Sequence, residues 1–185
     1  LYTFFMRNAF IFHGTGGTPQ ENWFPWLRNE LEKEGYEVFV PQFPTPENQT
    51  LEAWFEAFEP YQAHLDEQTL LFGHSLGGTF ALRVLEKFPI KIKAAFLVAT
   101  PIGIPPIKYL KADEPFAGHP FDWERIRAHA EQFFVLHSDN DPFVSLENGI
   151  QIAHHLNAPL LQISGAGHFN AASGYTEFDA LLNTF

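Results

Sequence analysis

The Gly-His-Ser-Leu-Gly sequence at residues 73–77 is the feature that most constrains the fold of this chain. It follows the apolar run 69–72 and precedes a stretch of good helix formers at 78–87. A G-x-S-x-G sequence in this setting is typical of a sharp strand-to-helix turn with an exposed, strained serine at its tip, because the glycines leave room for the turn. The motif therefore predicts a strand, a tight turn and a helix, with Ser75 as a candidate nucleophile.

Short apolar runs alternate with amphipathic helical stretches along the chain, which is the pattern of a parallel sheet built from βαβ units. The runs are nearly all apolar, as expected of strands that are covered on both faces. The predicted strands are 9–13, 37–41, 69–73, 94–99, 133–137 and 160–164. The predicted helices are 23–34, 51–64, 76–88, 123–130, 146–156 and 175–183. We expect an α/β fold over residues 1–185, a single-domain three-layer α/β/α sandwich with about six mostly parallel strands.

Several helix ends are also marked in the sequence. Gly35 is placed to end the first predicted helix. Asp122 and Ser145 stand where N-cap residues are expected, directly before two later helices.

The segment 101–121 has a different composition, with five prolines and two glycines, so no long helix is expected within it. We interpret it as a loop over the carboxyl edge of the sheet. It is either a small lid on a functional site or a connector that does not contact the substrate.

Charge and cysteine content exclude several classes of function. The formal charge is -11, and the 11 lysines and arginines are scattered rather than gathered in a stripe, so a nucleic-acid partner is not expected. The chain has no cysteine, which excludes disulfides, thiolate metal sites and a cysteine nucleophile and is compatible with a reducing cytosol. Any covalent catalysis must use another side chain.

No apolar run approaches the roughly 18 residues of a membrane span, and the first residues lack the features of a signal peptide. We therefore expect a cytoplasmic protein with no membrane partner, as a monomer or a small homo-oligomer. Met6 is the only methionine, so residues before it are interpreted either as an N-terminal extension or as part of a trimmed natural N-terminus.

A serine hydroxyl needs a base within hydrogen-bond reach, and the base needs an acid that orients it. The sequence Ser-Asp-Asn-Asp-Pro follows the fifth predicted strand at 138–142, and Gly-Ala-Gly-His-Phe follows the sixth at 165–169. Loops after parallel strands open on the same edge of a sheet, so Ser75 and His168 can converge there. The acid is Asp141 or Asp139; we favour Asp141, and Asp139 is then a turn-stabilising residue.

The remaining histidines have simpler interpretations. His137 ends a predicted strand and is read as a core or edge residue. Adjacent histidines on a helix cannot both face one ion, so no metal site and no cofactor are predicted. The histidines interpreted as solvated or packing residues are His64, His119, His129, His154 and His155.

A tetrahedral oxyanion requires two preorganised N–H donors. One is the backbone N–H of Leu76, directly after the nucleophile. The other is expected in the glycine-rich loop 13–17 after the first predicted strand, where we assign it to Thr15. This loop matches neither G-x-G-x-x-G nor a P-loop, so nucleotide binding is not predicted.

The chain resembles a family of small serine hydrolases within the α/β-hydrolase superfamily, the group of retinoblastoma-binding protein 9 and its bacterial relatives of the YdeN type. The resemblance covers nearly the whole chain from Phe10 and rests, beyond the motifs above, on the segments 23–27, 122–126, 141–143 and 167–169. It implies a compact α/β-hydrolase fold. It also implies a triad of Ser75, Asp141 and His168, which supports Asp141 as the acid. Without cysteine the chain has no Leu-x-Cys-x-Glu motif, so the partner of the animal namesake is not inferred.

These observations predict an acyl hydrolase that forms an acyl-Ser75 intermediate on small ester, thioester or amide substrates, with esterase activity on short acyl groups favoured. The short segment between the fourth and fifth strands leaves little material for a deep lipid tunnel. Phe143 and Phe169 flank the acid and the base and are candidates for the acyl pocket or for ordinary core packing. The alternative function is a non-catalytic interaction module that keeps the fold.

Overall fold

Six strands form one sheet in the computed structural model, which describes residues 7–184, and every neighbouring pair is parallel. The strand order is β2-β1-β3-β4-β5-β6. The strands are β1 (Arg7–Phe12), β2 (Tyr36–Phe39), β3 (Leu70–His74), β4 (Ile92–Val98), β5 (Ala130–Ser138) and β6 (Leu160–Ile163). All six predicted strands are present, and the N-terminal extension expected before Met6 lies outside the described residues.

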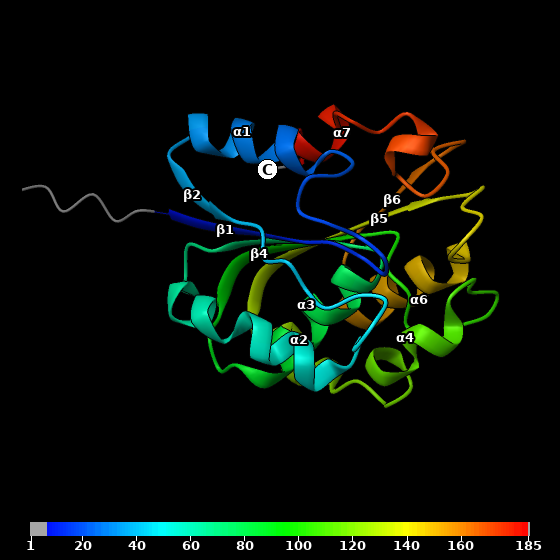
Figure 1. The fold of residues 1–185 in the computed structure, drawn as a ribbon, viewed down its shortest axis with the longest axis horizontal. Coiled ribbons are helices and arrows are strands. Elements are labelled where there is room, and N and C mark those ends of the chain that lie inside the picture. The colour runs from blue at the N-terminus through cyan, green and yellow to red at the C-terminus, as the bar shows by residue number, and fades with distance from the viewer. Residues whose placement is uncertain (1–6, 185) are drawn as a thin grey trace, which may run out of the picture.

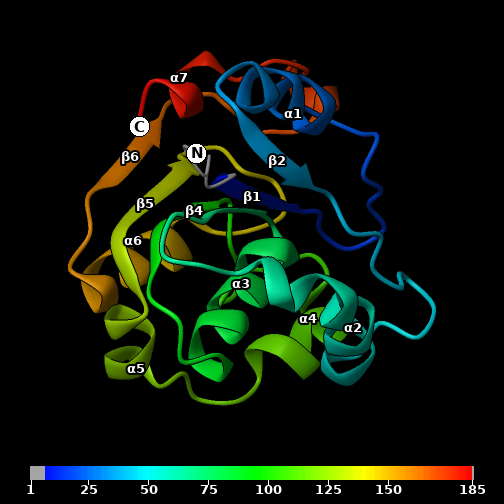
Figure 2. The ribbon, with the colours of Figure 1, turned by 90° about the vertical axis from the view of Figure 1, so that its left-hand side faces the viewer.

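Helices cover both faces of the sheet, as Figure 1 and the turned view in Figure 2 show. One face carries α1 (Phe24–Lys33) and α7 (Asp179–Leu182). The other face carries α2 (Leu51–Phe58), α3 (Leu76–Lys87), α4 (Leu110–Ala117), α5 (Trp123–Ala128) and α6 (Leu146–Leu156). Two short 3₁₀ helices, η1 (Glu59–His64) and η2 (Ala171–Ser173), complete the elements. The predicted three-layer α/β/α sandwich is confirmed.

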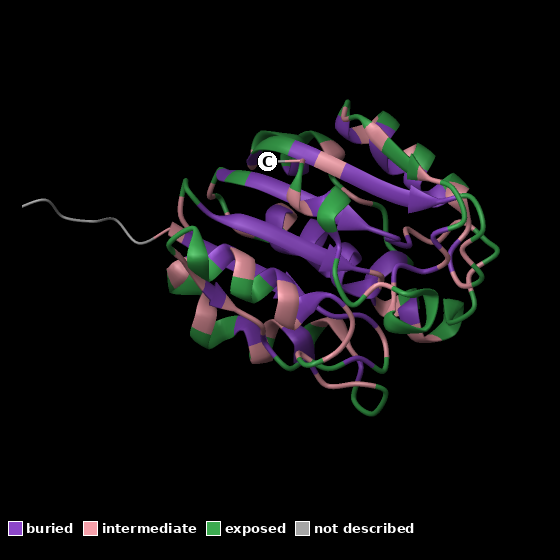
Figure 3. Ribbon diagram, turned by 90° about the horizontal axis from the view of Figure 1, so that it is seen from above, coloured by how far each residue is buried: buried purple, intermediate pink, exposed green. Residues whose placement is uncertain are grey.

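The core is rich in phenylalanine and is divided by the sheet into two apolar clusters, with the strands buried between them (Figure 3). Phe72, Phe96 and Phe134 lie opposite one another on β3, β4 and β5 and stack with ring centroids 4.3 and 4.8 Å apart. On the other face Phe43 stacks on Trp54 at 4.5 Å. Burial of so many large rings is the main source of apolar stabilisation in this fold.

Three predicted helices extend further than the helices in the structure. The predicted helix 51–64 is α helical only to Phe58 and continues as η1, because Pro60 lacks the N–H of a regular helical turn. Of the predicted helix 175–183, only Asp179–Leu182 is helical. The predicted helix 123–130 ends at Ala128, since β5 already begins at Ala130.

The three residues predicted at helix ends all lie at the ends of helices. Gly35 follows the last residues of α1 with a φ of 84°, which favours glycine. Asp122 accepts a hydrogen bond from the Arg125 N–H at 3.0 Å and caps α5 as predicted. Ser145 does precede α6, but its hydroxyl donates to the Ile104 carbonyl instead of capping the helix.

The proline-rich segment 101–121 is not a loop throughout, which corrects the sequence interpretation. It contains the eight-residue helix α4, with Pro115 inside it. The prolines at 101, 105, 106 and 120 lie outside the helix and limit its length. An antiparallel bridge between Ile107 and Val144 ties the segment to the loop after β5. The segment therefore lies at the carboxyl edge of the sheet, as expected.

None of the helices in the described chain combines the length and the apolar character that crossing a membrane requires.

The turn from β3 into α3 packs backbone against backbone. A Cβ at Gly77 would overlap the carbonyl oxygen of Phe12 in β1. A Cβ at Gly73 would come within 2.5 Å of the Cα of Gly78, so the turn has no space for larger residues. Glycine is therefore required here by close approach, and this contact holds the start of α3 against the end of β1.

We predict that Gly77→Ala destabilises the protein by about 3 kcal/mol or more, because rigid backbone atoms must move to admit one methyl group. Gly165→Ala is the matched control. A Cβ there meets nothing within 4 Å, and its φ of 73° adds a strain of only about 1 kcal/mol. Urea unfolding of both variants measures the difference, and equal losses would contradict the packing argument.

Candidate active site

Ser75 is held in a strained backbone conformation at the tip of the turn, with φ 54° and ψ -127°. Non-glycine residues rarely adopt a positive φ, and such strain persists only where the surroundings enforce it. Here the Ser75 N–H donates to the Val98 carbonyl at 2.8 Å, and the Ser75 carbonyl accepts from the Gly78 N–H at 2.9 Å. The serine is therefore fixed from both sides at the end of β3.

His168 and Asp141 form a hydrogen bond between the loops after β6 and β5. The Nδ1–H of His168 donates to Asp141 Oδ2 at 2.8 Å, and the Asp141 side chain is fully buried. The other carboxylate oxygen of Asp141 accepts the N–H groups of Phe143 and Val144 at 2.8 and 3.1 Å. Because these bonds fix the carboxylate, they also fix the tautomer and the orientation of the His168 ring.

Ser75 and His168 line the same cavity, which has a volume of about 180 Å³. Thr15, Glu21, Tyr109 and Asn170 are among its other lining residues, and they come from three separate parts of the chain. The structure thus brings the serine of the first motif and the histidine predicted as its base to one small, polar space.

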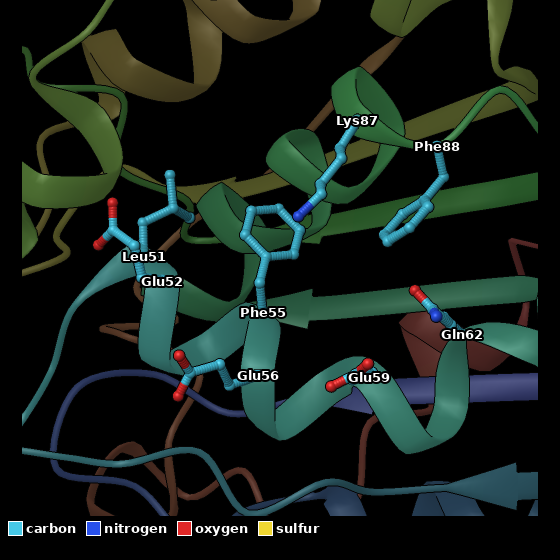
Figure 4. A pocket seen from close by; sticks show the side chains of 8 residues that line it. All are labelled: Leu51, Glu52, Phe55, Glu56, Glu59, Gln62, Lys87 and Phe88. Carbon is cyan, nitrogen blue, oxygen red and sulfur yellow. The ribbon is translucent and has the colours of Figure 1, made fainter.

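A larger hollow of about 520 Å³ lies elsewhere, between α2 and the end of α3 (Figure 4). Its rim carries Glu52, Glu56 and Glu59, and the Lys87 ammonium lies 3.9 Å from the ring centroid of Phe55 inside it. It shares no lining residue with the Ser75 cavity. We place the candidate chemistry at the smaller cavity because only that one holds the serine and the histidine.

The two predicted oxyanion donors, the backbone N–H groups of Leu76 and Thr15, lie at the start of α3 and in the loop after β1. Leu76 is the first residue of α3, so its N–H has no acceptor within the helix. The Thr15 N–H makes no hydrogen bond to any residue within 7–184. A Cβ at Gly14 would lie 2.8 Å from the Cβ of Ser75, so the backbone of this loop passes directly against the serine.

The two aspartates after β5 have different surroundings. Asp139 is exposed and accepts hydrogen bonds from the Ser164 hydroxyl at 2.6 Å and the Gly165 N–H at 2.8 Å. These bonds lower the pKa of the Asp139 carboxyl. Asn140 accepts from the Gly167 N–H at 2.7 Å in the same way. Asp139 therefore connects the loop after β5 to the loop that precedes His168. The sequence predicted instead that this residue stabilises its own turn.

His74 was left without a role by the sequence reasoning, although it belongs to the serine motif. It is buried, and its Nε2–H donates to the backbone carbonyl of His168 at 2.7 Å. Burial lowers the pKa of His74 to about 3, with a smaller contribution from the charge of His168, so the ring is neutral at pH 7. The same pentapeptide thus presents the serine and supports the loop of the histidine.

Two other buried histidines border this region. In His13, Nε2 accepts the N–H of Phe43 at 2.9 Å while Nδ1 lies 2.9 Å from the Gly14 carbonyl, and burial lowers its pKa. His137 is a core residue as predicted, and its Nε2 lies 3.1 Å from the Val144 carbonyl. The Nδ1 atom of His137 is buried and has no hydrogen-bond partner among residues 7–184, and burial lowers the pKa of this histidine as well.

The two phenylalanines suggested for the acyl pocket differ in position. Phe143 lines the Ser75 cavity, with its ring centroid 4.8 Å from that of His168. Phe169 is fully buried and stacks on Phe178 at 5.2 Å, on the α1 and α7 face of the sheet. Phe169 is therefore a core residue and does not line the Ser75 cavity.

No three histidine, aspartate or glutamate side chains between residues 7 and 184 are grouped closely enough to hold a metal ion.

A parallel sheet of this order, a strained serine after β3, and a histidine paired with a buried aspartate after β6 and β5 define an α/β hydrolase. The chain belongs to the serine hydrolase family, which it matches over residues 9–185. It is 27% identical over 183 residues to the YdeN protein of Bacillus subtilis (strain 168), with 97% of this chain and 96% of that protein covered. It is 28% identical over 171 residues to the serine hydrolase RBBP9 of Rattus norvegicus, with 92% and 88% covered.

Solved structures show the same fold. The crystal structure of the ydeN gene product from B. subtilis superposes with a TM-score of 0.90 at 27% identity and covers 97% of this chain and 96% of that one. Est1E from Butyrivibrio proteoclasticus superposes with a TM-score of 0.70 at 16% identity, with 97% and 86% covered. The resemblance to the YdeN and retinoblastoma-binding protein 9 group and the α/β-hydrolase fold are thereby confirmed.

The buried, neutral His74 predicts a pH-dependent stability. The unfolded chain protonates this histidine near pH 6.5, whereas the folded protein does so only near pH 3, so stability falls as the pH drops below about 6.5. At pH 5 the loss from His74 alone is about 2 kcal/mol.

We expect His74→Gln to reduce the difference in unfolding free energy between pH 8 and pH 5 by that amount, because the amide keeps the donor and does not titrate. Urea unfolding across this pH range measures it. His119→Gln, which replaces an exposed histidine, is the control. An unchanged pH dependence in His74→Gln would show that His74 is not buried in its neutral form.

Proposed function

We propose that this serine hydrolase cleaves small carboxylic esters, thioesters or amides through a covalent acyl-Ser75 intermediate. The observation that supports this most directly is the placement of a strained serine and an aspartate-paired histidine on one cavity of about 180 Å³. A serine becomes nucleophilic when a base removes its proton as it attacks, and His168 is the base available at this cavity.

In the proposed reaction His168 Nε2 takes the hydroxyl proton while Ser75 Oγ bonds to the substrate carbonyl carbon. The carbonyl oxygen becomes an oxyanion and accepts the N–H groups of Leu76 and Thr15, and Asp141 stabilises the imidazolium that forms. The intermediate then collapses, the bond to the leaving group breaks, and His168 returns the proton to the departing oxygen, sulfur or nitrogen. Water repeats the sequence on the acyl-enzyme and releases the acid.

The size of the cavity favours small substrates. Pockets that enclose drug-sized ligands usually have volumes of about 300–1,000 Å³, and this one is smaller. Phe143 and Tyr109 offer aromatic surface beside His168, which suits a short acyl group. A carboxylesterase-like activity on short acyl chains is therefore the substrate class that we propose, with no cofactor in the reaction.

An active-site fluorophosphonate probe tests the covalent step. We expect the wild type to be labelled at Ser75, and Ser75→Ala and His168→Ala each to lose about 10⁴ to 10⁶-fold in turnover of a short-chain aryl ester. The double variant is expected to be little worse than either single one, because the two residues act as a unit. A folded wild type that remains unlabelled and does not hydrolyse esters would instead support a non-catalytic interaction module.

The assignment of the acid can be tested with a matched pair of aspartates on one loop. We expect Asp141→Asn to lower kcat by about 10³ to 10⁴-fold, because an amide cannot stabilise the imidazolium and favours the wrong tautomer. Asp139→Asn should stay within about threefold of wild type, since that side chain only supports the neighbouring loop. The reverse ranking in steady-state kinetics would make Asp139 the acid.

A further inference from the structure

The hydroxyl of Thr15 is held from two sides by residues outside its own loop. It donates to Asp113 Oδ1 at 2.9 Å and accepts from Gln49 Nε2 at 3.0 Å. Asp113 belongs to α4, in the proline-rich segment, and Gln49 precedes α2. A hydroxyl that both donates and accepts has a defined rotamer, so these bonds fix the side chain of Thr15.

Gln49 extends this arrangement into a network that joins three segments. Its amide also donates to the Ala112 carbonyl at 3.0 Å, and its Oε1 accepts the Thr45 hydroxyl at 2.5 Å. Thr45 Oγ1 in turn accepts the backbone N–H of Gly16 at 2.6 Å. We call the side chains of Thr15, Thr45, Gln49 and Asp113 the Thr15 clamp. The clamp forms hydrogen bonds to two successive residues of the loop after β1, Thr15 and Gly16.

Burying the charged carboxylate of Asp113 costs folding free energy. The residue is only 3% exposed, and it forms no ion pair within the described part of the chain. Burial raises its pKa to about 6, against the hydrogen bond from Thr15 and the charge of His168, which act in the opposite direction. A buried carboxylate without a cation generally destabilises a fold unless its hydrogen bonds compensate. Core packing therefore does not explain why a carboxylate stands here.

The loop that is clamped needs an external restraint. Gly14, Gly16 and Gly17 surround Thr15, and glycine backbones have the most conformational freedom to lose. The loop passes directly against Ser75, and a shift of one of its N–H groups would remove it from the oxyanion.

We propose that Asp113 and Gln49 are positioning residues that hold the Thr15 N–H at the oxyanion site, so that α4 completes the active site from outside the sheet. This inference rests on the proposed acyl-transfer function. The clamp acts on the transition state, because the oxyanion exists only there and the neutral carbonyl of the bound ester gains little from the same donor. Loosening the clamp should therefore lower kcat and leave KM almost unchanged.

The test compares Asp113→Ala, Asp113→Asn and Gln49→Ala with wild type on a short-chain aryl ester. We expect Asp113→Ala and Gln49→Ala to lower kcat by about 10 to 100-fold with KM within about threefold, below the full loss of one oxyanion donor. Asp113→Asn should recover most of the loss, because its Oδ1 can still accept the Thr15 hydroxyl. The affinity for an arylboronic acid, which forms a tetrahedral adduct on the serine, should fall in proportion to kcat/KM.

Asp122→Ala is the matched control, since it removes a carboxylate directly after the proline-rich segment, and this carboxylate caps α5. It should lose stability and keep its kcat. Amide hydrogen exchange at residues 14–16 gives a readout independent of turnover, and we expect faster exchange in Asp113→Ala and Gln49→Ala than in the control. If Asp113→Ala does not fold, Gln49→Ala and Thr15→Val give the same comparison. Gln49→Ala removes the amide that donates to Thr15, and Thr15→Val removes the hydroxyl that bonds both Asp113 and Gln49.

Three results would overturn the inference while leaving the proposed function intact: an unchanged kcat in both clamp variants, a raised KM at constant kcat, or unaltered exchange at residues 14–16. A wild type that neither reacts with a fluorophosphonate nor hydrolyses an ester would overturn the proposed function, and the inference with it.

Discussion

The close approach of two backbones, at Gly77 and the carbonyl of Phe12, is the constraint on which the rest of the site depends. Because α3 starts so near the end of β1, the loop that leaves β1 must pass beside Ser75. The N–H of Leu76, at the start of α3, directly follows Ser75 and has no acceptor within the helix. The proposed nucleophile and the proposed oxyanion donors are thus arranged by main-chain packing, which does not relax as side chains change rotamer.

Backbone packing does not restrain the loops after β5 and β6. Side-chain hydrogen bonds hold these loops in place instead. Asp141 is anchored by two N–H groups of its own loop, and Asp139 and Asn140 hold the glycines that precede His168. The buried His74 supports the loop of His168 from behind, since its Nε2–H donates to the carbonyl of that residue.

Much of the fold was predictable from the sequence, because apolar runs and glycine-flanked motifs are local signals. The six strands and the convergence of Asp141 with His168 follow from run length and from the common edge of parallel strands. The helix α4 was missed because Pro115 lies inside it and the four other prolines of the segment lie on either side. The clamp around Thr15 could not be predicted, and the sequence could not decide between pocket and core for Phe169. Both depend on tertiary contacts between segments far apart in the sequence.

The bond from His74 to the carbonyl of His168 has a consequence for motion within the site. The residue that donates it is covalently adjacent to Ser75, so any thermal displacement of the tip of β3 pulls the loop of His168 in the same direction. We therefore expect the separation between Ser75 and His168 to vary less than the position of either residue. In the proposed reaction this separation matters more than a fixed place in the molecule, so the site tolerates small displacements of the sheet.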